Sequence, residues 1–146
     1  MSVQETNKLD HLLREHEVLR QILDQVGETV RARKATASDV VTEVVNLQRH
    51  VVEHFCHEEK GGYFAAAIEV APRLNERASS LLQQHPRLAA QLVELCRVAK
   101  LAQGSQPWWS ELHERFTDFL QAFEEHETAE NDLLQEAFID DIGDKD

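Results

Sequence analysis

Apolar residues recur every three or four positions along most of this chain, which predicts amphipathic helices. The first run predicts a helix over about residues 5–33 and contains Leu9, Leu12, Leu13, Leu19, Leu23 and Val26. The second run contains Val41, Val44, Leu47, Val51 and Phe55. It predicts a helix that follows a polar turn at 35–39, has Ser38 as its N-cap and extends to about Lys60.

Glycine and proline divide the rest of the chain. The glycine pair at 61–62 interrupts the pattern, and the apolar residues 63–70 predict a short helical continuation that Pro72 ends. The segment Gly-Ser-Gln-Pro at 104–107 ends one helix and starts the last, which is expected over about residues 108–137.

A third long helix is expected over about residues 76–102. Pro86 interrupts it, because proline lacks an N–H and disfavours helical geometry at the residue before it. The helix therefore either kinks at His85 or starts there. Ser80 and Gln83 match an earlier capping box, which favours the kink.

Four long amphipathic helices with short connections predict an all-α fold, an up-down-up-down antiparallel four-helix bundle. The length of 146 residues suits one domain, 1–146, with its core at about 8–137 and an acidic tail at 140–146. The net charge of −12 argues against nucleic acid or an anionic membrane as partner. The polar start of the chain does not resemble a signal peptide, and Cys56 and Cys96 suggest reduced thiols, so a cytoplasmic location is expected.

Two histidines lie four residues before a glutamate within apolar stripes, in the pairs His54–Glu58 and His126–Glu130. Residues four apart share a helix face, so each pair offers an imidazole and a carboxylate in one direction. The pair His11–Glu15 has the same spacing but polar neighbours, which assigns it to the solvent face.

Two lone histidines, His16 and His85, also lie in apolar stripes. In antiparallel helices, residues at one level are equidistant from the turn between them. His16 and His54 are equidistant from residue 35, and His85 and His126 from 105–106. Glu58 and His85 are equidistant from 71–72, so three turns agree with a single level in the bundle.

These positions form a candidate ligand set of four imidazoles and two carboxylates: His16, His54, Glu58, His85, His126 and Glu130. The set is too large for one tetrahedral zinc ion. It suits two metal ions, each held by two imidazoles and both sharing two bridging carboxylates, with an oxo or hydroxo bridge and an open position on each ion. Nitrogen and oxygen donors without thiolate favour iron, with manganese or zinc as substitutes.

Neighbouring residues leave alternatives open. His57 and His50 are possible additional ligands or outer partners of the site, and Glu59 or Glu127 could replace its neighbouring glutamate. Tyr63 reaches the site only if the chain folds back after the glycine pair.

The ordered set of six resembles the hemerythrin-like (HHE cation-binding) family over about residues 8–137. The matching segments are REHEVL around His16, HFCHEE with His54 and Glu58, LLQQHPRL around His85, and EEHETAE with His126 and Glu130. The resemblance implies a four-helix bundle with an oxo-bridged di-iron centre in which both glutamates bridge.

The chain departs from the oxygen-carrying members of that family. They have a fifth histidine where this chain has Ala89, and a differently spaced aspartate where it has Glu130. The four-His, two-Glu set is more similar to the di-iron proteins of iron–sulfur cluster repair. Those typically carry an N-terminal cysteine-bearing domain, for which this chain is expected to have no room.

The leading functional hypothesis is a non-haem di-iron protein that binds or reduces dioxygen, nitric oxide or hydrogen peroxide. Its task would lie in sensing, oxidative or nitrosative stress response, or iron handling, and peroxidase-like, catalase-like or nitric-oxide-related turnover is left open. The alternative is a metal-independent acidic helical module that docks a partner protein through Trp108, Trp109 and Tyr63.

Overall fold

The computed structural model describes residues 3–140, except for the side chains of 4–6 and 140. The long helices are α1 (Val3–Ala32), α2 (Ala37–Lys60), α4 (Asn75–Lys100) and α5 (Gln106–Gln135). A short helix, α3 (Tyr63–Val70), and a 3₁₀ turn (Pro72–Leu74) connect α2 to α4, and a π-helical turn (Glu136–Asp140) follows α5. The expected acidic tail beyond residue 140 lies outside the described residues.

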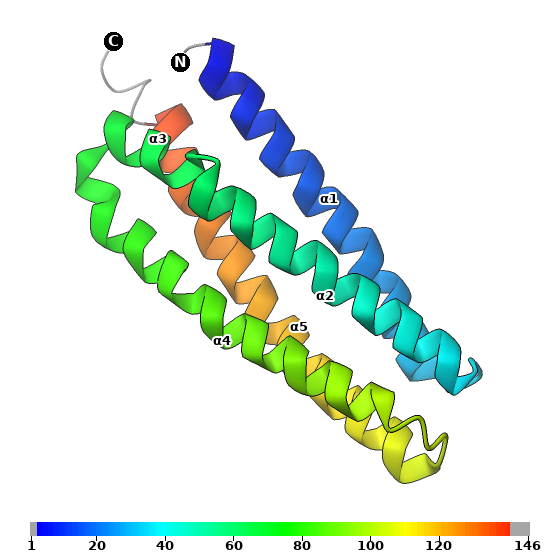
Figure 1. Ribbon diagram of the computed structural model, residues 1–146. Helices are drawn as coiled ribbons and strands as arrows, with labels where there is room; N and C mark the ends of the chain where they lie inside the picture. The colour runs from blue at the N-terminus through cyan, green and yellow to red at the C-terminus, as the bar shows by residue number, and fades with distance from the viewer. Residues whose placement is uncertain (1–2, 141–146) are drawn as a thin grey trace.

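The four long helices form the predicted up-down-up-down antiparallel bundle (Figure 1). Around the bundle, α1 packs on α2, α2 on α4, α4 on α5, and α5 on α1. The α1–α2 and α4–α5 connections lie at one end, called here the loop end, and α3 covers the other, called the α3 end.

The N-caps of two helices, α2 and α4, differ from expectation. Helix α2 begins at Ala37, and Thr36 rather than Ser38 is its N-cap, with its hydroxyl accepting from the N–H of Asp39 at 3.1 Å. Helix α4 begins at Asn75 and passes through Pro86, so Ser80 lies inside the helix and caps nothing.

The glycine pair turns the chain from α2 into α3 as expected. Gly62 is left-handed, with a φ of 82°, and starts α3. A Cβ on Gly61 would clash with the carbonyl oxygen of His57, so a larger residue there requires a backbone shift. The turn places Tyr63 and Phe64 inside the α3 end of the bundle.

The buried apolar side chains form two clusters along the bundle axis. The loop-end cluster is the larger and includes Leu19, Leu47, Val51, Phe55, Leu88, Leu92, Phe119 and Phe123. The α3-end cluster comprises Leu12, Tyr63, Phe64, Ala67, Ala71, Leu74, Ala78, Leu81, Leu133, Leu134, Ala137 and Phe138. A layer of polar side chains separates the two clusters.

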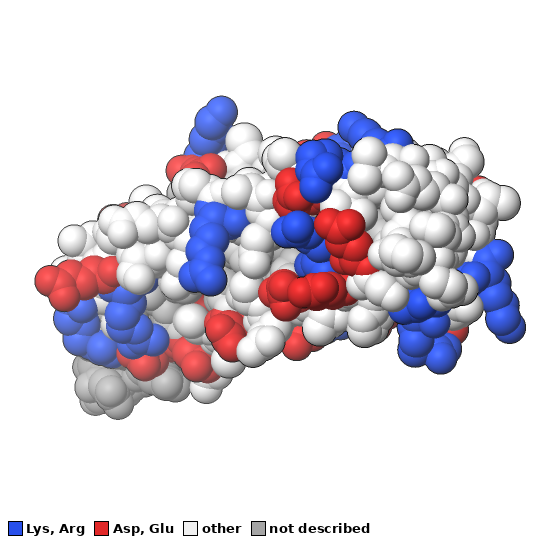
Figure 2. Space-filling model, turned by 90° about the horizontal axis from the view of Figure 1, so that it is seen from below, with Lys and Arg blue, Asp and Glu red and all other residues white. Residues whose placement is uncertain are grey.

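Charged side chains of both signs lie on the surface of the bundle. On the face shown in Figure 2, basic side chains are interspersed with acidic and uncharged ones and form no continuous basic area. Among the described residues, no helix is both long and apolar enough to cross a membrane.

Candidate metal centre

The polar layer brings together all six residues singled out in the sequence. Helix α1 contributes His16, α2 contributes His54 and Glu58, α4 contributes His85, and α5 contributes His126 and Glu130. Each is at most 8% exposed. Each lies between apolar residues of its own stripe, so the periodicity that buries the stripe also carries these side chains inward.

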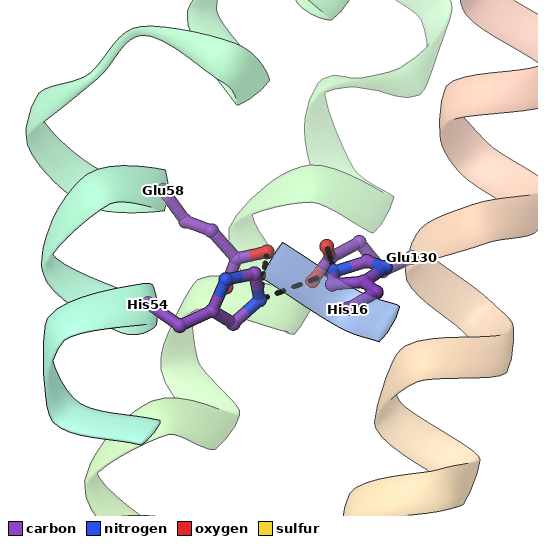
Figure 3. A group of neighbouring side chains, drawn as sticks. All are labelled: His16, His54, Glu58 and Glu130. Atoms are coloured by element: carbon purple, nitrogen blue, oxygen red, sulfur yellow. Dashed lines mark hydrogen bonds and ion pairs between the residues drawn. The ribbon is translucent and has the colours of Figure 1, made fainter. Parts of the chain in front are cut away.

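Four of the side chains form the first half of the centre (Figure 3). Nε2 of His16 lies 3.1 Å from Nε2 of His54 and 2.9 Å from Oε1 of Glu130. Nε2 of His54 lies 3.4 Å from Oε2 of Glu58. Two imidazole nitrogens and two carboxylate oxygens therefore point at one another from three helices.

The second half contains His85 and His126, whose ring centroids are 5.1 Å apart. Nε2 of His85 lies 3.0 Å from Oε1 of Glu58, and Nε2 of His126 lies 3.4 Å from Oε2 of Glu130. Each carboxylate thus presents one oxygen to the first half and its other oxygen to the second. The side chains close enough to hold a metal ion are His16, His54, Glu58 and Glu130 in the first half and Glu58, His85 and His126 in the second.

Burial and mutual proximity perturb the charges of these groups. Burial, together with Glu130, raises the pKa of Glu58 to about 8. Burial also acts to raise the pKa of Glu130, but contacts with Glu58, His126 and His16 outweigh it and lower that pKa. The two carboxyl groups therefore favour sharing a single proton when no cation lies between them.

Burial lowers the pKa of His54, but its hydrogen bond to Glu15 and the nearby carboxylate of Glu58 outweigh burial and raise the value to about 10. Burial also opposes protonation of His16, but the nearby carboxylate of Glu130 outweighs burial and raises the pKa of His16. Both imidazoles therefore favour the protonated form, His16 because of Glu130 at its inward Nε2, and His54 because of Glu15 at its outer Nδ1 as well as Glu58.

Many polar atoms of the centre lack a hydrogen-bond partner. They include both oxygens of Glu58, both oxygens of Glu130 and the Nε2 atoms of His85 and His126. Their close approaches lack hydrogen-bonding geometry, although more than nine in ten buried polar groups in proteins are hydrogen-bonded. Such a concentration in one layer fits a donor set for cations, and the side chains are close enough to hold a metal ion.

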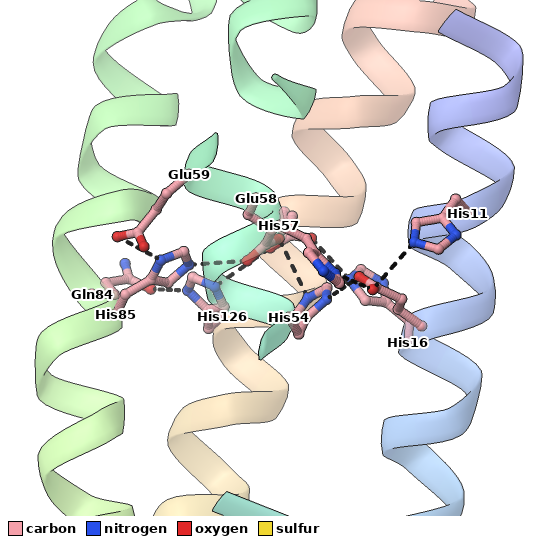
Figure 4. Close-up of polar contacts among 11 residues, drawn as sticks. His11, His16, His54, His57, Glu58, Glu59, Gln84, His85 and His126 are labelled. Atoms are coloured by element: carbon pink, nitrogen blue, oxygen red, sulfur yellow. Dashed lines mark hydrogen bonds and ion pairs between the residues drawn. The ribbon is translucent and has the colours of Figure 1, made fainter. Parts of the chain in front are cut away.

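Hydrogen bonds to outer partners orient two of the four imidazoles (Figure 4). Nδ1–H of His54 donates to Oε1 of Glu15 at 3.0 Å, and Nδ1–H of His126 donates to Oε1 of Gln84 at 2.8 Å. Nδ1 of His85 lies 3.6 Å from Oε1 of Glu59, beyond hydrogen-bond range. The two hydrogen bonds leave Nε2 of His54 and Nε2 of His126 facing inward, and they resemble the outer partners of metal-ligating histidines.

The structure also places the residues left as alternatives. Glu59 is exposed, as the apolar stripe predicted. Glu127, in contrast, is buried near His16, and burial raises the pKa of the Glu127 carboxyl group. His57 is exposed and contacts Glu15. His50 donates to the carbonyl oxygen of Asn46 and lines a groove beside His54.

Sequence reasoning missed Glu15 and Gln84. Glu15 was assigned to solvent together with His11, but its carboxylate bends inward at the edge of the stripe and is only 18% exposed. A helical period places the Cβ of a residue but not the end of a long side chain. The one available signal was that Glu15 precedes His16 directly.

Comparison of the chain with family models, with curated proteins and with solved structures found no match.

Proposed function

We propose that this chain is a hemerythrin-like protein whose centre holds two iron ions, oxo- or hydroxo-bridged, and binds or reduces a small oxidant. Dioxygen, nitric oxide and hydrogen peroxide are the candidate ligands. The proposal rests on how the carboxylate oxygens of Glu58 and Glu130 are divided between the two halves of the centre. One oxygen of each carboxylate faces a histidine of the first half, and the other oxygen faces a histidine of the second half. One ion between four imidazoles would not require that division.

The donor chemistry supports iron. Imidazole and carboxylate without thiolate suit iron, and manganese or zinc can occupy the same donors. The four imidazoles and two carboxylates would hold the two ions, and iron ions held there would supply the redox chemistry that a small oxidant needs.

The surroundings limit the ligand to a small molecule. The ring of Phe55 stacks on His85 at a centroid distance of 3.9 Å, and Phe123 lies 6.4 Å from His126. These rings exclude bulk water from the loop-end side of the centre. A groove of about 230 Å³ reaches His54 from the surface, and one of about 180 Å³ reaches His126.

The side chains around the centre do not identify a reaction. Tyr63 is buried in the α3-end cluster, and its pKa is raised by burial and by Glu15 and Glu58. Ala89, one turn after His85, is partly buried and offers no donor beside the second half. We propose that the protein acts in sensing, stress response or iron handling in the cytoplasm. Measurement of oxidant consumption decides whether it also turns the oxidant over as an enzyme.

The alternative was a metal-independent docking module. Its three aromatic residues do not form a docking surface, because Trp108, Trp109 and Tyr63 are 1%, 4% and 7% exposed. Trp108 instead donates from Nε1 to the carbonyl oxygen of Val98 and anchors the start of α5.

The iron-loaded, reduced protein should react with at least one of the three oxidants. Stopped-flow absorbance, with the protein kept anaerobic until mixing, measures this reaction. We expect a spectral change that is lost in His126→Ala and kept in His113→Ala, since His113 is an exposed histidine of the same helix. Continued consumption of peroxide would identify an enzyme. Iron-loaded protein that is inert to all three oxidants would refute the proposal.

A further inference from the structure

A second group of ligand-type side chains lies outside the buried centre, where α1 and α2 face each other near the surface. It consists of His11 and Glu15 from α1 and His57 from α2 (Figure 4). Oε2 of Glu15 lies 3.3 Å from Nε2 of His11 and 2.5 Å from Nδ1 of His57. The three donor atoms lie within 4.8 Å of one another.

We propose that His11, Glu15 and His57 form a separate surface site that binds one divalent transition-metal ion. Two imidazoles and one carboxylate are a donor set used by iron(II) and zinc, with the remaining positions taken by water. The side chains of His11 and His57 are 55% and 49% exposed, so water has access to those positions.

The backbone favours this arrangement. His11 and Glu15 are one helical turn apart on α1, which places both side chains on the same face. His57 is in the last turn of α2, and its carbonyl oxygen accepts from the N–H of Gly61 at 2.6 Å, so the helix end is closed beneath it. Two helices that pack in the bundle therefore hold the three donors in place.

The surface site shares one residue with the buried centre. While Oε2 of Glu15 faces His11 and His57, Oε1 accepts from Nδ1–H of His54. His11, Glu15 and His54 also line the same groove, which extends from the surface toward the centre. The surface ion would therefore lie beside the route to the centre and act on the carboxylate that orients His54.

The two sites use different ligands, which allows each to be removed alone. His11→Ala and His57→Ala each delete one surface donor, and Glu58→Ala deletes a bridging carboxylate of the centre. His113→Ala is the matched control, since His113 is exposed on α5 and belongs to neither group.

Zinc is the probe, measured as ions bound per chain after equilibration with excess zinc. We expect three in the full chain and in His113→Ala, two in His11→Ala and His57→Ala, and one in Glu58→Ala. One ion in the unmodified chain that is lost in His11→Ala but kept in Glu58→Ala would support the surface site and count against the centre. Equal zinc content in His11→Ala, His57→Ala and the unmodified chain would show an ordinary surface ion pair and overturn this inference.

Discussion

The carboxylates of Glu58 and Glu130 are the residues that most constrain what this bundle can do. They are 1% and 0% exposed, and an unpaired charge at such depth is strongly unfavourable. Imidazoles approach all four of their oxygens, but with poor hydrogen-bonding geometry. A pair of cations between the oxygens and the imidazoles would offset the desolvation of both carboxylates.

Replacing either carboxylate by alanine should prevent binding of the metal pair. Glu58→Ala and Glu130→Ala each remove one oxygen from both halves, so the centre should fall from two ions per chain to none. Iron analysis after reconstitution and desalting measures this. Glu125→Ala, an exposed glutamate of α5, should keep both ions, and a variant of Glu58 or Glu130 that also kept both would disprove bridging.

Glu15 should act on the centre through His54. Loss of its hydrogen bond to Nδ1–H leaves the ring less well oriented and less basic, so Glu15→Ala should weaken metal binding at the centre by about tenfold to a hundredfold. Glu15→Gln keeps an oxygen acceptor and should lose less. Competition with a chromophoric chelator gives the affinities, and equal affinities in all three proteins would exclude this orienting role.

The sequence was sufficient to find residues that lie on an apolar stripe, such as His16 and His85, because burial and helical period place them together. It was insufficient for Glu15 and Gln84. Their contacts depend on where long side chains end, and therefore on how far apart the neighbouring helices lie. The distance between packed helices is a property of the bundle and cannot be read from one helix.

At the scale of the helices, periodicity predicted the elements better than their ends. Several hydroxyls near residue 38 were able to cap α2, and the turn geometry selects Thr36, whose backbone is extended. The hydroxyl of Thr42 instead donates to the carbonyl oxygen of Ser38 inside the helix. Pro86 stays within α4 because the helix packs along its length on α2 and α5, and that packing outweighs the missing hydrogen bond.

The two candidate caps of α2 provide a direct comparison. Thr36→Ala removes the acceptor for the N–H of Asp39 and should lower the free energy of unfolding by about 1 kcal/mol. Ser38→Ala removes no cap and should stay within about 0.5 kcal/mol of the unmodified chain. Urea denaturation followed by circular dichroism measures both, and a larger loss for Ser38→Ala would contradict the assignment.

In the whole molecule, the polar layer separates the loop-end cluster from the α3-end cluster. The α3-end cluster is smaller and relies on a short helix and on the ends of α1, α4 and α5. An occupied centre ties together all four long helices at the boundary between the clusters. Metal binding should therefore stabilise the α3 end more than the loop end.

Removal of the metal should make the α3 end open more easily. At a metal concentration of about 100 times the dissociation constant, metal binding adds about 2.7 kcal/mol to the free energy of any opening that releases the metal. Amide exchange through such an opening should therefore be roughly a hundredfold faster once the metal is removed. Hydrogen exchange with and without chelator should show this acceleration in residues 63–70 and 133–138, and less in 88–99. Equal acceleration at both ends, or none, would contradict a metal centre located between the clusters.

Metal analysis combined with an optical spectrum would decide whether Glu58 and Glu130 share a pair of iron ions. Two irons per chain are expected, with the absorption of an oxo-bridged diferric centre that changes when azide is added to the oxidised protein or nitric oxide to the reduced one. A chain that retains less than one iron after reconstitution and shows no such absorption would contradict the account.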